Sequence, residues 1–146
     1  MMTLTEFADM LEVGLRTATP RLEIGLDNVG ELAETLAGTY PGHYQAGWAP
    51  LAAATIADKE ARGFPVPSPL KRTGEMAESY KRELLPADLA VVVGSPEEKA
   101  LWQELGTSRM PARPVVALAM ASALPHAHEV FGEIAVSILT GKALLR

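Results

Sequence analysis

The sequence predicts an α+β fold in which a long N-terminal helix and a C-terminal helix pack on a small, mostly antiparallel sheet. Three observations lead to this prediction. Apolar residues recur at helical spacing over the first 39 residues and again over residues 114–140. Between them, residues 89–93 (LAVVV) are short, β-branched and followed by a turn, which is typical of a strand. At 146 residues we expect a single domain, 1–146, with an insertion of loop and helix at about 40–70.

The N-terminal stretch opens with a capping box, Thr3-Leu4-Thr5-Glu6, which predicts a helix start near residue 4. Two apolar stripes follow: Leu4, Phe7, Ala8, Leu11, Leu15 and Ala18, then Leu22, Leu26, Val29, Leu32, Ala33 and Leu36. The stripes are in phase because Leu4 and Leu22 are 18 residues apart, which is five helical turns. We therefore favour one helix of roughly 50 Å, kinked at Pro20. The alternative is a two-helix hairpin with Thr19 as N-cap.

Glycine and proline divide the middle of the chain. Pro50 opens a helix over Leu51–Arg62, and its mixed charges (Asp58, Lys59, Glu60 and Arg62) indicate a solvated face. The prolines at 65, 67 and 69 predict an extended, stiff linker, with a peptide ligand as the alternative.

Thr73 is expected to cap the next helix. There Met76, Tyr80 and Leu84 would face the core, and Glu78 would pair with Arg82 one turn later.

The strand at 89–93 needs a partner, because unpaired backbone groups are costly. We expect that partner in residues 81–85, in the arm at 109–116 or in a neighbouring subunit. The last helical region is predicted from Pro114 to Leu124, interrupted by Pro125 and resumed to about Thr140. Its expected core stripe is Ala127, Val130, Phe131, Ile134 and Ile138, with Gly141 as the stop and Lys142 and Arg146 near the negative end of the helix dipole.

Residues 95–114 combine a marked helix with an arm. Ser95 and Glu98 form a capping box, so the helix should run from about residue 96 to Leu105, and Gly106 fits the left-handed position beyond it. Because a proline restricts the residue before it, we expect Arg109–Arg113 to be extended. The polar groups of this arm have no obvious partner in their own segment, which suggests docking. The alternative is a connector with solvated arginines.

Composition restricts the function classes. With 48% apolar and 21% charged residues and no cysteine, the chain is typical of a soluble globular protein without disulfides, thiolate zinc sites or cysteine nucleophiles. No signal peptide or membrane-spanning run is evident, so we expect a cytoplasmic product without a membrane partner. Residues 1–39 hold seven acids and two bases, whereas the remainder is balanced. Without a basic stripe, DNA is expected only to pass the protein.

The sequence contains no convergent set of titratable groups, so we expect no enzyme, no catalytic residue and no cofactor. His126 and His128 are two residues apart, which places their rings about 200° apart on a helix. Because His43 is distant in the sequence, we expect no metal site. Neither a nucleophile elbow nor a glycine-rich phosphate loop is present.

Two motif blocks resemble known families. Glu104-Leu105-Gly106-Thr107 followed by Met110-Pro111-Ala112-Arg113-Pro114 resembles the signature of phage tail-completion (neck) proteins. The upstream block resembles the related virion morphogenesis family of Mu-like phages; it comprises Trp48-Ala49-Pro50-Leu51, Thr55, Lys59, Pro69-Leu70, Thr73-Gly74 and Ser79-Tyr80. The blocks occur in the expected order. Val115 stands where the family often has an aromatic, and Ala100-Leu101-Trp102 where it often has Tyr-Ala, which leaves the subfamily open.

The resemblance implies a structural virion assembly protein that forms a homo-oligomeric ring, a hexamer or dodecamer, at the head-tail junction. Such a ring completes the tail and connects it to the head-closure (adaptor) protein. The implied partners are further copies of the chain, the head-closure protein and a tail terminator or tail-tube protein, with DNA passing through the lumen, which the acidic helix face could line. The implied location is the virion neck, after assembly in the bacterial host cytoplasm. Alternatives are a tail terminator that caps the tail tube and a monomeric peptide-binding module. An active phage, a prophage or a domesticated gene transfer particle could encode the chain.

Through the resemblance, eleven residues are candidates for contact with a neighbouring subunit or partner: Trp48, Thr73, Gly74, Glu104, Gly106, Thr107, Arg109, Met110, Pro111, Arg113 and Pro114. We hypothesise that Arg113, and secondarily Arg109, pairs with a carboxylate from Glu104 or from the acidic helix across a subunit boundary, because guanidinium groups match carboxylates. The alternative is that Thr73-Gly74 and Gly106-Thr107 form only caps and turns.

Overall fold

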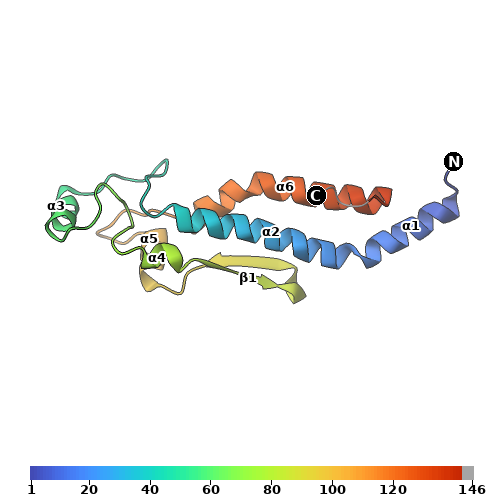
Figure 1. Ribbon diagram of the computed structural model, residues 1–146, viewed down its shortest axis with the longest axis horizontal. Helices are drawn as coiled ribbons and strands as arrows, with labels where there is room; N and C mark the ends of the chain where they lie inside the picture. The colour runs from blue at the N-terminus through green and yellow to red at the C-terminus, as the bar shows by residue number, and fades with distance from the viewer. Residues whose placement is uncertain (143–146) are drawn as a thin grey trace. The chain divides into compact units, whose positions relative to one another are not determined.

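The computed structural model describes residues 1–142 (Figure 1). Its helices are α1 (Leu4–Arg16), α2 (Ala18–Thr39), α3 (Ala53–Ala61), α4 (Glu75–Glu78), α5 (Glu98–Leu105) and α6 (Val116–Thr140). Strands β1 (Lys81–Leu85) and β2 (Ala90–Gly94) form a two-stranded sheet and are joined by the short 3-10 helix η1 (Pro86–Asp88). The predicted α+β class is confirmed, with long helices towards both ends and an antiparallel pair of strands. The prediction for Arg146 lies outside the described residues.

The chain divides into two compact units. Unit 1 contains Met1–Glu31, Glu83–Val92 and the C-terminal part from Ala123; unit 2 contains Leu32–Arg82 and Val93–Ser122. Every candidate site residue predicted from the sequence therefore belongs to unit 2.

The helical start of unit 1 differs from both predictions. Instead of one helix kinked at Pro20, α1 and α2 are separated by the single residue Thr17, and Thr19 lies inside α2 rather than capping it. Pro20 has no N–H, and its ring clashes with the carbonyl four residues earlier, which belongs to Arg16. The break therefore falls in the turn that precedes the proline. There the Thr17 hydroxyl donates to the carbonyls of Val13 and Gly14, at 3.1 Å each.

Helices α1, α2 and α6 approach closely within unit 1. A Cβ placed on Gly14 would lie 2.9 Å from the Ile138 carbonyl oxygen, and one on Gly25 would lie 2.9 Å from Ile134 Cδ1. Arg21 donates to the Ser137 hydroxyl at 2.8 Å. The predicted α6 stripe is confirmed as buried or half-buried, whereas the predicted α1 stripe is largely exposed. Helix α1 contacts α6 through the side that carries Gly14, so most of its apolar stripe is exposed in the part of unit 1 that the structure describes.

Helix α6 runs through Pro125 without interruption, contrary to the prediction. A proline inside a helix removes one backbone hydrogen bond and costs about 3 kcal/mol. Ala123 and Ala127 are buried on either side of this exposed proline. Their packing holds the backbone in the helix and offsets that cost. As predicted, Gly141 follows the helix with a positive φ of 65°.

The core of unit 2 is one cluster of buried side chains contributed by five segments. It contains Ala37, Trp48, Tyr80, Ala100, Val115 and Ala119. Small alanines on α2, α5 and α6 surround the two large aromatic side chains. Two of the six residues, Trp48 and Tyr80, come from the upstream motif block, which places that block at the centre of the unit.

Candidate functional site

Arg113 is the buried charge of the downstream motif block, with only 5% of the residue exposed. Its guanidinium donates through Nε and Nη2 to the Ala49 carbonyl oxygen, at 3.2 and 3.0 Å, and through Nη2 to the Pro50 carbonyl oxygen, at 3.2 Å. The Arg113 N–H donates to the Gln103 carbonyl at 2.7 Å. The downstream motif block is thus bound directly to the upstream block within one chain.

Within one chain, Arg113 therefore does not pair with the Glu104 carboxylate, and a pair across a subunit boundary stays a hypothesis. The arm folds back onto unit 2, where backbone carbonyls at the Trp48-Ala49-Pro50 turn accept these hydrogen bonds from the Arg113 side chain. A fork of donors fits two adjacent carbonyls as well as it fits one carboxylate. Trp48, expected at an interface, is itself buried in the core.

Glu104 instead binds the N-terminus of α6. Its Oε2 accepts from the Val115 and Val116 N–H groups, at 2.6 and 3.0 Å, and its Oε1 accepts from Ala117 N–H at 2.8 Å. The first N–H groups of a helix lack partners inside the helix, and the positive end of its dipole favours a carboxylate there. Glu104, which belongs to α5, provides both the hydrogen-bond acceptors and the negative charge, so it fixes the position of α6 against α5.

The Glu104 charge also acts on the core. Burial, and secondarily the Glu104 carboxylate, raises the pKa of Tyr80 to about 12. Among residues 1–142, the Tyr80 hydroxyl and the Trp48 indole N–H find no hydrogen-bond partner. Both aromatic side chains therefore contribute through apolar packing, and Tyr80 is held protonated.

The arm between α5 and α6 is a tight turn rather than an extended segment in its first half, which corrects the prediction. Thr107 and Met110 exchange backbone hydrogen bonds, at 2.8 and 3.2 Å, so Arg109 lies exposed in the turn between them. Pro111 restricts Met110 but leaves Arg109 free to turn. Pro111 is exposed and Pro114 is half-buried, both in the irregular segment that leads to α6.

Gly106 makes this turn possible. Its φ of 72° favours glycine, and a Cβ at this position would lie 2.7 Å from the Ala112 backbone nitrogen. The predicted positive φ after α5 is confirmed, but the ψ of 177° is extended, so Gly106 does not adopt the left-handed helical conformation that was predicted. The predicted capping box at the start of α5 is wrong: the Ser95 hydroxyl accepts from Glu97 N–H at 3.0 Å and lies 2.6 Å from the Ser79 hydroxyl, and α5 begins only at Glu98.

Thr73 and Gly74 precede a helix of only four residues, α4, whose N-cap is Gly74 with a φ of 104°. Thr73 is therefore not the cap, and Leu84 belongs to a strand rather than to the same helix. The predicted Glu78–Arg82 pair is also wrong, because the change to a strand separates these residues, and Arg82 donates to Glu34 at 2.8 Å. Thr73 and Gly74 line an open hollow of about 370 Å³ with residues from the end of α2, including Gly38 and Thr39.

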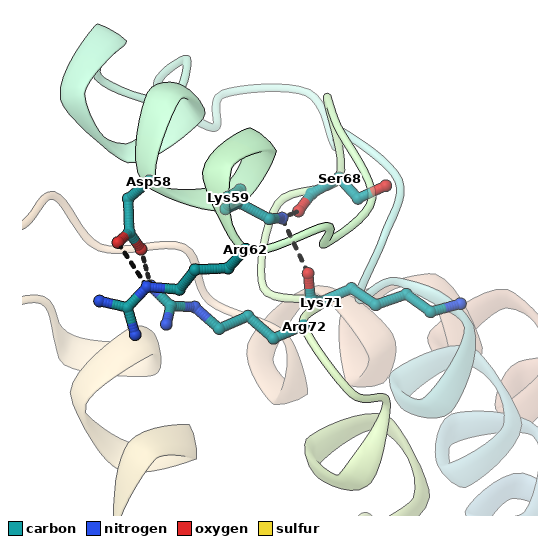
Figure 2. Close-up of polar contacts among 6 residues, drawn as sticks. All are labelled: Asp58, Lys59, Arg62, Ser68, Lys71 and Arg72. Atoms are coloured by element: carbon teal, nitrogen blue, oxygen red, sulfur yellow. Dashed lines mark hydrogen bonds and ion pairs between the residues drawn. The ribbon is translucent and has the colours of Figure 1, made fainter.

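Sequence reasoning missed the role of Lys59, which is only 3% exposed although its neighbours indicated a solvated face. Figure 2 shows its ammonium group between two backbone carbonyls: it donates to the Ser68 oxygen and to the Lys71 oxygen, the latter at 2.8 Å. Burial, and secondarily the Arg72 charge, lowers the pKa of Lys59. The ammonium thereby gathers the proline-rich segment into turns, where an extended linker was predicted. Only the place of Lys59 in the upstream motif signalled this role.

Asp58, next to Lys59, holds two arginines on the outer side of the same loop. Its carboxylate lies 2.7 Å from Arg62 Nε and 2.9 Å from Arg72 Nη2 (Figure 2). The Arg72 guanidinium also lies over the Phe64 ring, 5.4 Å from its centroid. These contacts fix a basic surface on an otherwise acidic chain.

Residues 1–142 contain no group of three or more His, Cys, Asp or Glu side chains placed to bind a metal ion. Within the same residues, no helix is both long and apolar enough to cross a membrane. No protein-family model, curated protein or solved structure matches the chain.

Proposed function

We propose that this chain is a structural subunit of a phage neck, which forms a ring at the head-tail junction and connects the tail to the head-closure protein. The observation that carries this proposal is the interlocking of the two motif blocks. Arg113, from the arm, binds the carbonyls of Ala49 and Pro50, and Tyr80 packs beside Val115 in one core. Two blocks that are far apart in the sequence and resemble two related families thus pack together in one structural unit.

Exposed apolar side chains support an assembly role. Helix α5 exposes Leu101, Trp102 and Leu105, which are spaced to lie on one side of the helix. Tryptophan at a surface patch is typical of residues that dominate protein–protein binding. Helix α1 exposes a second apolar stripe, including Leu4 and Leu15. Exposed apolar surfaces of this kind typically mark sites of contact with another protein.

The motif residues fall into two groups, those that stabilise the fold and those that can contact a partner. Glu104, Gly106 and Arg113 belong to the first group, because they contact other residues of unit 2. Arg109 and Pro111 are exposed and stay available to a partner. We therefore place the partner contact at the α5 patch and the adjoining turn.

The test is binding to purified phage head-closure and tail-tube proteins from the same genome, followed by gel filtration. We expect stable co-elution with the head-closure protein. Trp102→Ser/Leu105→Ser should abolish it, whereas the exposed apolar control Leu124→Ser should bind as the wild-type protein does. Binding to the tail-tube protein alone would replace the proposal with a tail terminator. Binding to neither protein would contradict a neck role.

A further inference from the structure

Helix α1 presents an exposed face that combines apolar and acidic side chains. We define the α1 face as Leu4, Ala8, Asp9, Glu12 and Leu15, all of which are exposed; Leu4 and Leu15 retain 84% and 68% of their exposure. The packed side of α1 is marked by Gly14, where a Cβ would lie 2.9 Å from the Ile138 carbonyl oxygen. At 100° per residue, Leu4, Ala8 and Leu15 lie within about 40° of one another and about 80° to 120° from Gly14. Among residues 1–142, this face of α1 stays exposed.

The loop after α3 presents the complementary combination, apolar and basic. We define the α3-loop surface as Arg62, Pro65, Pro67 and Arg72, all exposed. The two arginine side chains retain 63% and 51% of their exposure although both contact Asp58 (Figure 2). Residues 58–72 hold four bases and two acids, whereas α1 holds three acids and one base. The Lys59 ammonium holds the loop backbone in place, so this surface is formed before any partner arrives.

We propose that copies of this chain bind head to tail, with the α1 face of one copy on the α3-loop surface of the next. This inference rests on the proposed assembly function and names its self-contact. Charge complementarity selects the occupant: Asp9 and Glu12, the latter already paired with Arg16 within α1, would face Arg62 and Arg72, and the leucines would cover the prolines. A nucleic acid could satisfy the arginines but would leave the α1 face uncovered, and two exposed arginines form no stripe along a phosphate backbone.

The two surfaces lie on different parts of the chain, so the contact is heterologous. Such contacts close into rings when the rotation between copies allows it, and otherwise grow into filaments. A heterologous contact makes a prediction that a symmetric α1–α1 contact does not. If one variant is altered on the α1 face and another on the α3-loop surface, a mixture of the two should form a dimer but no larger assembly.

The experiment measures mass by light scattering for an acid-reversed variant, Asp9→Lys/Glu12→Lys, and a base-neutralised variant, Arg62→Gln/Arg72→Gln. An uncharged second α1 variant, Leu4→Ser/Leu15→Ser, covers the case in which the lysines disturb the helix. The matched controls are Glu83→Lys/Glu98→Lys and Lys99→Gln/Lys142→Gln, which change as many exposed charges elsewhere. Thermal melting verifies that each variant is folded.

We expect the charge variants to associate roughly tenfold more weakly than the wild-type protein, since two exposed ion pairs contribute about that factor. The Leu4→Ser/Leu15→Ser variant should also associate more weakly, because it removes apolar area from the contact. The controls should associate normally. Mixing the acid-reversed and base-neutralised variants should give a one-to-one dimer that grows no further, because one intact α1 face and one intact loop surface remain.

Several outcomes would overturn the inference. If both variants form the same ring as the wild-type protein, the inference fails while the ring proposal stands. If the base-neutralised variant still dimerises alone, the contact is a symmetric one between α1 helices. Loss of binding to a labelled DNA duplex by that variant, with self-association unchanged, would assign the arginines to nucleic acid. Open filaments abolished by both variants would uphold the inference and contradict a ring. A wild-type protein that stays monomeric at every concentration would refute both.

Discussion

Arg113 places a permanent charge where 95% of the residue is shielded from solvent, and its partners are neutral carbonyls. A buried charge is tolerated only when its donors are satisfied. The planar fork of the guanidinium reaches Ala49 and Pro50 together, which a lysine ammonium cannot do in the same geometry. The motif arginine is thus explained by the fold of unit 2 without any partner subunit.

Replacing Arg113 with lysine should therefore lower the free energy of unfolding by about 2–4 kcal/mol, because one buried charge loses part of its hydrogen bonding. Urea unfolding of the purified protein measures the change. Arg109→Lys is the matched control, since Arg109 is exposed in the adjacent turn, and it should change stability by less than about 0.5 kcal/mol. Equal stability of the two variants would show that the Arg113 contacts to Ala49 and Pro50 do not support the fold.

Tyr80 provides a prediction for alkaline pH. Its pKa is raised to about 12 by burial and by the Glu104 carboxylate, whereas an unfolded tyrosine titrates near pH 10. The unfolded state therefore loses this proton first, so the Tyr80 contribution to stability is complete below about pH 10 and is lost as the pH rises towards 12. Over that window the wild-type protein should lose on the order of 2 kcal/mol more than Tyr80→Phe.

The measurement is urea unfolding of both proteins at several pH values between about 9 and 12. Tyr44→Phe is the control, because Tyr44 is exposed. Since the Tyr80 hydroxyl has no hydrogen-bond partner among residues 1–142, its removal should change stability little at neutral pH. Parallel alkaline losses in the wild-type protein and Tyr80→Phe would contradict the raised pKa.

At the scale of elements, α5 and α6 are coupled by Glu104, whose carboxylate accepts three N–H groups from the start of α6. Hydrogen bonds to an ionised carboxylate are stronger than those between neutral groups. Glu104→Gln keeps the shape but removes the charge and one acceptor oxygen. We expect it to lower the free energy of unfolding by about 1–2 kcal/mol.

Chemical denaturation of Glu104→Gln beside Glu98→Gln checks this expectation. Glu98 is exposed at the beginning of α5, so its substitution should cost only a few tenths of a kcal/mol. The coupling would be disproved if both substitutions had the same effect.

Elements with local signals were predictable from the sequence. The apolar stripe of α6, the short strand β2, and the glycines at 106 and 141 follow from periodicity, β-branching and helix-end chemistry. The helix break was misplaced by three residues, because the clash of Pro20 acts on the preceding turn.

Contacts between residues that are far apart in the sequence could not be predicted from sequence patterns. Arg113 and Ala49 are separated by 64 residues, and no periodicity links them. Lys59 was expected to be solvated because lysine seldom lies buried unless its ammonium is satisfied, and its partners are backbone carbonyls that carry no residue-type signal. The amphipathic pattern of α1 was correct as a pattern, but it cannot distinguish a face that packs inside the chain from one that awaits another molecule.

At the scale of the whole molecule, charge and apolar exposure are distributed unevenly along one chain. Acids gather in the first 39 residues, bases gather around the α3 loop, and leucines remain exposed on α1 and α5. In the head-to-tail assembly that we propose, the opposite charges would meet and the leucines of α1 would be covered, while those of α5 would be left for a second partner. Such contacts should weaken as salt screens the charges.

The measurement that tests the ring proposal most directly is the mass of the purified wild-type protein by light scattering, across protein concentration at moderate salt. We predict a mass that rises with concentration and then stops at one fixed multiple of the chain, as a closed ring requires. A mass equal to that of the single chain at every concentration, or one that grows without limit, would contradict it.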